Sequence, residues 1–406
     1  MSDAVQILDR STPARRSRLC EFVLQRLCRR MTCGVLNVVM PGGAAHVHRT
    51  RQPGPEATLV VHSWRTLRRL LLGGDVGFGE AFVDGDWSSP DPVALLEVAL
   101  RSSAAAASKV DDPVWARVIN MVLHRLRPNT LAGSRRNIVE HYDLGNDFYR
   151  LWLDRGMSYS SALYAEPTMS LEAAQRAKQD RVIALLDAQP AHAVLEIGCG
   201  WGGMAQRLAE GCRHVTGLTL SPAQRAHAVE ALAAAGLSDR ADIRLEDYRE
   251  ASGSFDRIVS IEMLEAVGEA YWPAYFDRVR SLLKPGGVAV IQVITIDDDR
   301  FAVYRRQPDF VQRHVFPGGM LPSPRMIRTH AVRAGLQIDV QEMFGGSYVR
   351  TLQEWRSRFI AAWPAIAALG FSPRFRRLWE YYLCYCEAGF RVGTIDVGLW
   401  RLRRSP

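Results

Sequence analysis

Residues 194–203, VLEIGCGWGG, place one acid and four glycines within ten positions. Three of the glycines have the spacing GxGxxG, which is typical of a turn between a strand and a helix where bare backbone approaches a ligand. A dinucleotide site would also need an acid about twenty residues later, at the end of the next strand. That position, Leu218 to Ser221, contains no acid, whereas Glu196 stands just before the glycines. The turn therefore indicates a ligand other than a dinucleotide.

The elements that would position this turn are strands and helices that alternate from about residue 191 onward. Ser221 and Pro222 are typical of a helix N-cap and first turn. Strands separated by helices of this length imply parallel βαβ units in a doubly wound sheet. The expected strands are 192–198, 214–220, 241–247, 255–263 and 288–296, and the expected helices are 202–211, 221–236 and 271–287.

The composition sets broad limits on the class of protein. A chain of 406 residues is long enough for two domains with separate cores. The net charge of +8 favours an anionic partner, either nucleic acid or an acidic membrane surface, although a basic soluble enzyme has the same charge. Seven irregularly spaced cysteines argue against a zinc site or a disulfide framework, so we expect no metal and a reducing, cytosolic setting. We recognise no targeting signal and no apolar run long enough to span a bilayer.

Several motifs resemble one family. The order E-x-G-x-G-x-G resembles the first motif of S-adenosyl-L-methionine (SAM) methyltransferases. Together with other stretches in the same order, it resembles the cyclopropane fatty acid synthases, which methylenate alkenes in phospholipid acyl chains. The matching stretches are HYDLGNDFYRLWLD (141–154), MSYSSALY (157–164), VLEIGCGWGG (194–203), SIEMLEAVG (260–268), FPGGMLPS (316–323) and FIAAWP (359–364), with GFGEAFVDGDW (77–87) matching more loosely.

This resemblance implies an α/β fold, a class I SAM-methyltransferase with a Rossmann-like doubly wound sheet and a smaller amino-terminal α+β domain. We expect a lipid- or membrane-associated domain over 1–110, a linker and connecting helix over 111–140, and the catalytic domain over 141–406. Within the first domain we expect strands at 33–40 and 57–63, a short basic helix at 63–74 ended by glycine, a structured loop at 74–87, and a linker or loosely held helix at 100–112.

The resemblance also implies which residues bind SAM. Thr219 and Gln224 match the family's substitutes for a ribose-binding acid, and Asp247 and Tyr248 match its adenine-binding positions. A strand-end role for Thr219 and a turn-capping role for Asp247 remain as structural alternatives. The full expected set is Tyr159, Ser160, Glu196, Gly198, Gly200, Thr219, Gln224, Asp247 and Tyr248.

In the implied reaction an alkene attacks the sulfonium methyl group, and the resulting carbocation must lose a proton. The family's proton acceptor is a bound bicarbonate, held by a glutamate, a histidine, a tyrosine and backbone near a cysteine and an isoleucine. By motif register Glu265 matches the glutamate, with Glu262 as its competitor. Two positions depart from the family, because serine replaces the cysteine and glutamine replaces the histidine. The expected catalytic set is Glu265, Tyr348, Gln292, Ser161 and Ile294.

These departures leave the product open. Glutamine can hydrogen-bond bicarbonate but cannot carry a proton at neutral pH, and serine cannot be a thiolate. Removal of a proton from the added methyl closes a cyclopropane ring, which we expect, whereas its removal from a neighbouring chain carbon gives a branched alkene. Tyr348 and other aromatic residues near the C-terminus could stabilise the cation. The rival functions are a nucleic-acid methyltransferase and a lipid-binding protein that has lost catalysis.

The expected partner is the unsaturated acyl chain of a phospholipid at an anionic membrane surface, and no nucleic acid. The basic start interleaves arginines and apolar residues at near-helical spacing, which suits a membrane surface or the protein's own domain. Residues 304–322 are a candidate lid over an acyl tunnel. The expected location is cytoplasmic, peripheral to the inner face of the cell membrane, and a homodimer is a family expectation. The residues of the basic start are Arg15, Arg16, Arg18, Leu19, Phe22, Val23, Arg26, Leu27, Arg29 and Arg30.

Overall fold

The computed structural model describes residues 24–25, 28–29, 31–106 and 144–406. The chain divides into two compact units, Met1–Asp111 and Asp112–Pro406. The expected linker over 111–140 lies outside the described residues, so its boundaries stay predictions.

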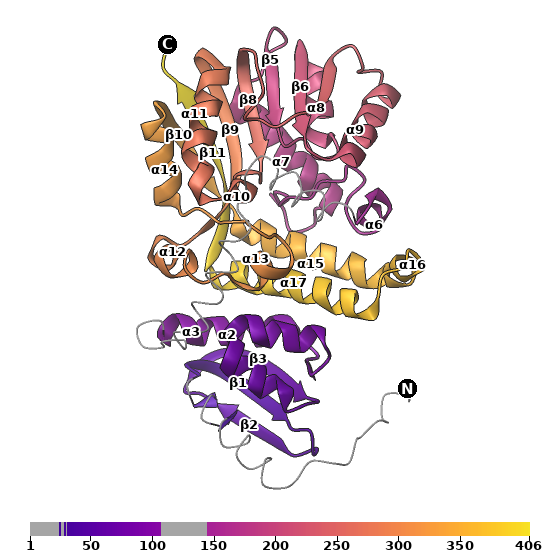
Figure 1. Ribbon diagram of the computed structural model, residues 1–406, viewed down its shortest axis with the longest axis vertical. Coiled ribbons are helices and arrows are strands. Elements are labelled where there is room, and N and C mark those ends of the chain that lie inside the picture. The colour runs from indigo at the N-terminus through magenta and orange to yellow at the C-terminus, as the bar shows by residue number, and fades with distance from the viewer. Residues whose placement is uncertain (1–23, 26–27, 30, 107–143) are drawn as a thin grey trace. The chain divides into compact units, whose positions relative to one another are not determined.

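Over residues 31–106, the smaller unit is a four-stranded sheet with helices α2 and α3 (Figure 1). Its strands follow the order β2-β1-β3-β4, in which β1 pairs with β3 in parallel and with β2 in antiparallel register. The inward-facing residues of β1 and β3 alternate with more exposed ones, as expected for a sheet with one buried face. The elements are β1 (Cys33–Val39), β2 (Ala45–Arg49), β3 (Gln52–Val61), α2 (Arg65–Val83), β4 (Trp87–Ser88) and α3 (Pro92–Ala106).

Helix α2 corrects one expectation. The stretch 74–87 was expected to be a loop, but the helix bends at Gly74 (φ +54°) and continues to Val83. Gly77 explains why a glycine-rich sequence is helical here, because a Cβ at this position would lie 2.2 Å from the carbonyl oxygen of Arg69. The glycines thus permit a close approach of the two helical segments, a tertiary requirement that local propensity does not reveal.

The larger unit is built on a seven-stranded sheet with the order β10-β11-β9-β8-β5-β6-β7 (Figure 1). The five neighbouring strands β9, β8, β5, β6 and β7 are parallel, which confirms the predicted doubly wound sheet. Strands β10 and β11 pair in antiparallel register and extend the sheet beyond β9. The strands are β5 (Ala193–Ile197), β6 (His214–Thr219), β7 (Ala241–Leu245), β8 (Phe255–Ile261), β9 (Leu283–Ile296), β10 (Leu336–Met343) and β11 (Ile395–Arg404).

The helices between these strands begin where the sequence predicts. The Ser221 side chain accepts a hydrogen bond from the Gln224 amide, and Pro222 occupies the first turn of its helix, as expected. The helical elements are α6 (Asn146–Arg150), α7 (Leu171–Leu186), α8 (Gly203–Gly211), α9 (Pro222–Ala234), α10 (Leu264–Val267), η1 (Glu269–Tyr271), α11 (Trp272–Leu282), α12 (Asp298–Tyr304), α13 (Phe310–His314), α14 (Pro324–Arg333), α15 (Gly345–Ala361), α16 (Trp363–Ala368) and α17 (Pro373–Val392).

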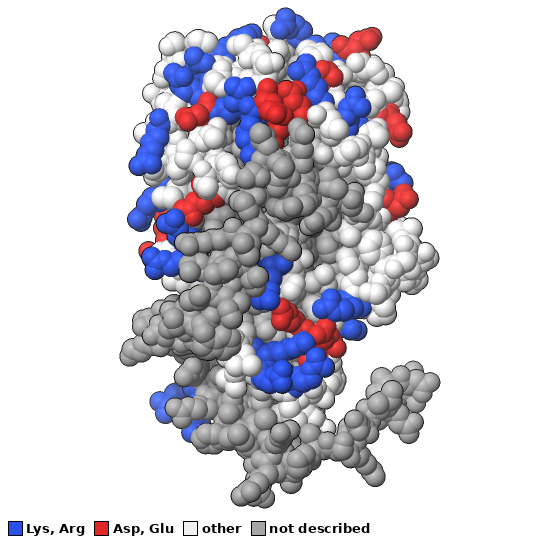
Figure 2. Space-filling view, in the orientation of Figure 1, with Lys and Arg blue, Asp and Glu red and all other residues white. Residues whose placement is uncertain are grey.

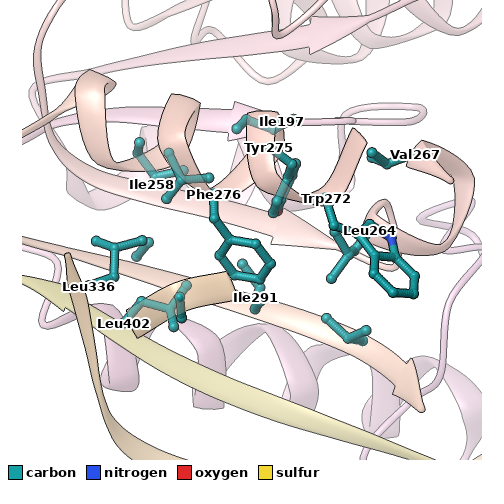
Figure 3. Close-up of a cluster of buried hydrophobic side chains, with 14 of the residues drawn as sticks. Ile197, Ile258, Leu264, Val267, Trp272, Tyr275, Phe276, Ile291, Leu336 and Leu402 are labelled. Carbon is teal, nitrogen blue, oxygen red and sulfur yellow. The ribbon is translucent and has the colours of Figure 1, made fainter. Parts of the chain in front are cut away.

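Helices cover both faces of the larger sheet, because successive strand residues join different cores. Ile258 and Ile291 pack in the cluster with α11 and α14, whereas their neighbours Val259 and Val290 pack in the cluster with α7 and α8. Figure 3 shows Phe276 of α11 pointing toward Ile291 of β9. The strands of this sheet are therefore held from two sides.

Phe276→Ala is expected to lower the free energy of unfolding of the larger unit by about 3–5 kcal/mol, because the fully buried ring would leave a cavity. Denaturant titration followed by circular dichroism measures this loss. Val229→Ala on α9 is the control, since Val229 is 43% exposed and its truncation should change stability by less than about 0.5 kcal/mol. Equal losses in the two variants would contradict the packing described for Phe276.

Candidate active site

A pocket opens at the carboxyl ends of the central parallel strands. Strand β5 pairs with β6 on one side and with β8 on the other, so the chain leaves β5 and β8 in opposite directions at this point. In doubly wound sheets this switch in direction opens a crevice that binds ligands. Residues that follow β5, β6, β7 and β8 all line the pocket.

The structure brings all nine expected cofactor residues together at this pocket. They come from separate parts of the chain, and their roles in binding remain those that the resemblance implies. The residues that line the pocket include Tyr159, Ser160, Glu196, Gly198, Gly200, Thr219, Gln224, Asp247 and Tyr248.

The glycine turn lies against the pocket in a conformation that needs glycine. Gly198 has φ +78°, and a Cβ on it would meet Cγ of Met263 at 2.7 Å. The backbone amides of Gly198 and Cys199 donate to the carbonyl oxygen of Leu218 at 3.0 and 2.8 Å, which ties the turn to β6. Gly200 also has positive φ, but a Cβ there would meet nothing within 4 Å. The backbone of Gly198 and Gly200 therefore lines the pocket without side chains.

Thr219 and Gln224 form a buried pair where the dinucleotide acid would stand. The Thr219 hydroxyl donates to Oε1 of Gln224 at 2.8 Å and accepts the Ser221 amide at 3.2 Å. The side-chain oxygen of Gln224 therefore accepts from Thr219, so the N–H groups of the same side-chain amide are left to bind a ligand. An uncharged donor of this kind suits a ribose hydroxyl.

Asp247 has a structural partner as well as a place in the pocket. Its Oδ1 accepts the backbone amide of Arg249 at 2.9 Å, and its carboxylate pairs with the Arg249 guanidinium at 2.7 and 2.8 Å. The turn-capping alternative is thus present in the structure. It does not exclude a ligand contact, because Asp247 still lines the pocket.

Lys178 is a pocket residue that the sequence analysis missed. It is 4% exposed, and its Nζ donates to the Ser160 hydroxyl at 2.7 Å. Burial lowers its pKa, whereas the nearby carboxylates of Glu262, Asp154 and Glu196 oppose that shift. Burial raises the pKa of Glu196 to about 8 despite Lys178. The available sequence signal was a lysine on the mainly apolar face of helix α7, which it shares with Ala174, Gln175 and Val182.

Three of the five expected catalytic residues converge on Glu262. Its Oε1 accepts the Ser161 backbone amide at 2.8 Å and Nε2 of Gln292 at 2.6 Å, and its Oε2 accepts the Tyr348 hydroxyl at 2.8 Å. Ser161 and Gln292 are fully buried, whereas Glu262 is partly exposed and lines the pocket. Burial raises the pKa of Glu262, although these donors and Lys178 counteract the rise.

Glu265, which motif register favoured over Glu262, occupies a different position. Its Oε1 accepts the backbone amide of Ile294 at 2.5 Å, and its own carbonyl oxygen accepts the amide of Met320 at 2.8 Å. The second contact joins the expected lid, 304–322, to the catalytic unit. Burial, followed by the charge of Glu262, raises the pKa of Glu265 to about 8. Glu265 therefore does not share the donors of Ser161, Gln292 and Tyr348.

The expected bicarbonate does not fit these contacts. The Ser161 amide, the Gln292 amide nitrogen and the Tyr348 hydroxyl all donate to Glu262. The remaining expected donor, the Ile294 amide, donates to Glu265. Because protein carboxylates already occupy all these donors, bicarbonate would have to displace them.

Aromatic rings lie beside the Glu262 cluster. Tyr348 packs on Phe390 and Trp355 with ring centroids 4.5 and 6.0 Å apart, and Trp355 lies 5.3 Å from Tyr159. Tyr159 is also a pocket residue, and its hydroxyl lies 3.1 Å from that of Tyr382. Among the described residues, no group of His, Cys, Asp or Glu is arranged to hold a metal ion.

Sequence comparisons identify close relatives over most of the chain. A family model described as mycolic acid cyclopropane synthetase matches residues 130–400. The tuberculostearic acid methyltransferase UfaA1 of Mycobacterium tuberculosis is 39% identical over 400 residues, which cover 94% of this chain and 91% of that protein. The cyclopropane-fatty-acyl-phospholipid synthase of Escherichia coli is 35% identical over 338 residues, covering 82% and 84% of the two chains.

A solved structure agrees with these relatives. The mycolic acid cyclopropane synthase CmaA1, complexed with SAH and CTAB, is 31% identical and aligns with a TM-score of 0.63. The alignment covers 66% of this chain and 98% of that chain. The predicted class I methyltransferase fold is thereby confirmed.

Gln224→Ala is expected to weaken SAM binding about tenfold, because a buried hydrogen-bond donor to the ligand would be lost. Isothermal titration calorimetry with SAM measures the change. Glu230→Gln, on the exposed side of the same helix, is the control and should bind as the parent protein does. Unchanged affinity in the Gln224 variant would remove this residue from the expected binding set.

The motif order, the sheet topology and the pocket agree with the comparisons. The expected residues come together where the strand order switches, and the family model spans most of the larger unit, from before α6 to within β11. The chain belongs to the mycolic acid cyclopropane synthetase family.

Proposed function

We propose that this protein transfers a methyl group from SAM to a double-bond carbon of an unsaturated phospholipid acyl chain. The observation that carries the proposal is one pocket that joins the nine expected SAM residues to the carboxylate of Glu262. The SAH complex of the CmaA1 relative supports the choice of cofactor. The E. coli relative, named as a fatty-acyl-phospholipid synthase, supports the class of substrate.

The chain's own residues fit the demands of this reaction. When bound, SAM supplies an electrophilic methyl group on a sulfonium centre. The Gly198 turn and the Thr219–Gln224 pair would hold the cofactor, while the rings of Tyr159, which lines the pocket, and Tyr348, which donates to Glu262, would provide electron-rich faces near the developing carbocation. Dry aromatic faces stabilise a cation by roughly 2 kcal/mol. Glu262 adds a negative charge at the same place.

For the product we favour a methylene-branched chain over the cyclopropane ring expected from the sequence. The relative with the wider coverage, 94% of this chain, is named as a tuberculostearic acid methyltransferase and not as a cyclopropane synthase. By the resemblance, Ser161 and Gln292 stand where cyclopropane synthases have cysteine and histidine. The Ser161 backbone amide and the Gln292 side-chain amide both donate to Glu262. The cyclopropane is the second candidate, supported by the family description and the E. coli relative.

Incubation with methyl-labelled SAM and vesicles of mono-unsaturated phospholipid distinguishes these products. We expect labelled fatty esters that take up hydrogen on mild hydrogenation, measured by mass spectrometry before and after treatment. A labelled ester that resists hydrogenation would identify a cyclopropane. SAM binding without labelled lipid would contradict methyl transfer and favour a lipid-binding protein without catalysis.

We also propose that the smaller unit contacts an anionic membrane from the cytoplasmic side. In the first half of α2, Arg65 and Arg68 are exposed beside Leu71 and Leu72, which are each 48% exposed. Figure 2 shows basic side chains gathered on the smaller unit where Figure 1 draws α2. Apolar side chains flanked by arginines suit an anionic lipid surface. None of the helices described is long and apolar enough to cross a bilayer.

The basic start expected to serve the same purpose lies mostly outside the described residues. Of its six arginines, the structure describes Arg29, which is exposed, and the others lie outside the described residues. The proposal for membrane contact therefore rests on α2.

The double variant Arg65→Glu/Arg68→Glu is expected to weaken binding to vesicles that contain anionic phospholipid by at least tenfold. Each basic residue near such a surface contributes about 1 kcal/mol. Vesicle co-sedimentation measures the change. Arg176→Glu/Arg333→Glu alters the net charge equally at exposed positions of the larger unit and serves as the control. Equal weakening in both variants would show that overall charge, and not α2, governs binding.

A further inference from the structure

We propose that the Glu262 carboxylate is itself the base that removes the proton, in the position where the resemblance predicts bicarbonate. This inference rests on the methyl transfer proposed above but holds for either product. It identifies a catalytic residue built into the chain and makes the reaction independent of bicarbonate.

The donor set carries the inference. Bicarbonate is a planar carboxylate-like anion, and three of the five residues expected to surround it are Ser161, Gln292 and Tyr348. All three donate to Glu262 within 2.6–2.8 Å. The two N–H donors on Oε1 require that oxygen to act as an acceptor, which favours the ionised carboxyl. The side chain thus supplies the same anionic group, already held by the same donors.

The backbone at Glu262 provides an independent observation. Its φ is +49°, in the left-handed region that favours glycine. Among the described residues, the other non-glycine residues with positive φ are Met157 and Asp187. Such conformations cost about 1 kcal/mol and concentrate at functional sites. Glu262 adopts this conformation despite the energetic cost, and the backbone conformation places its side chain on the three donors.

The surrounding charges favour Glu262 as the ionised member of the two carboxyls. Lys178 lies close enough to lower the pKa of Glu262, whereas Glu265 receives no such help. Burial and the negative charge of Glu262 raise the pKa of Glu265 to about 8, so Glu265 holds its proton at neutral pH. Glu265 then remains a neutral neighbour that positions the Ile294 backbone.

The chemical step balances without an oxidant or reductant. Methyl transfer joins the methyl carbon to one alkene carbon and breaks the carbon–sulfur bond, whose electron pair stays on sulfur. The other alkene carbon becomes positive. For a ring, electrons of a methyl C–H bond join the methyl carbon to this cation. For a methylene branch, a hydride first moves from the methylated carbon to the cation, and the C–H electrons then form the new double bond. In both cases the proton passes to a carboxylate oxygen of Glu262.

Gln292 is suited to accept the result of this transfer. Its Nε2 donates to Glu262, while its buried Oε1 has no hydrogen-bond partner among the described residues. When Glu262 becomes protonated, rotation of the amide presents Oε1 to the new O–H group. Glutamine can therefore serve both protonation states of Glu262 without carrying a proton itself. This accounts for an amide where the family has an imidazole.

The test compares the parent protein with Glu262→Gly in buffer stripped of carbon dioxide. We expect the parent to methylate vesicle lipid at the same rate with and without added bicarbonate, and to show no binding of ¹³C-bicarbonate by NMR. Glu262→Gly is expected to lose at least a hundredfold in rate, as for loss of a general base. Because glycine tolerates this φ and leaves the three donors open, added bicarbonate should bind to the variant and restore part of its rate.

Asp187→Gly is the matched control, since it relieves the same kind of backbone strain at a distant helix end. It should retain the parent rate, and both variants should bind SAM normally. Bicarbonate binding by the parent, or a parent rate that falls without bicarbonate, would overturn the inference while leaving methyl transfer intact. Because bicarbonate binding is measured without turnover, a parent that binds none while methylating no lipid would refute the proposed function alone. Full activity of Glu262→Gly without bicarbonate would also overturn the inference.

Discussion

A carboxylate placed among buried groups must receive hydrogen-bond donors, and the arrangement of the catalytic unit meets this requirement at Glu262. The donors come from three segments that are remote in the sequence: the 157–164 loop, strand β9 and helix α15. An unpaired buried carboxylate would cost several kcal/mol or take up a proton. The contacts therefore both hold these segments together and keep a negative charge available.

The same strand end joins this charge to the cofactor pocket. Met263 follows Glu262 directly and fills the space that a side chain on Gly198 would need. Met263 thus packs against the glycine turn that follows β5, while the adjacent Glu262 supplies the carboxylate that follows β8. A substitution at Gly198 would push on Met263 and so disturb both the pocket and Glu262. The pocket and the Glu262 carboxylate lie at the same end of the sheet because the parallel strands end there together.

The sequence predicted the parallel strands and the Ser221 helix cap of the larger unit, but it did not predict the second half of α2 or the buried Lys178. The strands from β5 to β9 are mostly short apolar runs flanked by turn residues, and both signals are local in the sequence. The Ser221 cap is likewise a hydrogen bond between residues three positions apart. The prediction of a loop over 74–87 was wrong because Gly77 permits a close approach to the backbone of Arg69, and this approach depends on tertiary packing. Lys178 was missed because a lysine in a helix is usually solvated, and its buried contact to Ser160 appears only after folding.

The sequence by itself determined the fold class, the ligand-binding glycine turn and the types of residue around it, since these depend on short-range spacing and motif order. Motif register favoured Glu265 over Glu262, which lies three positions earlier in the same motif, but it did not show which donors each carboxylate would accept. Only the tertiary structure decided that, because the left-handed turn at Glu262 places one carboxylate on Ser161, Gln292 and Tyr348, while Glu265 accepts the Ile294 amide. Donors that converge from distant segments have no signature in local sequence.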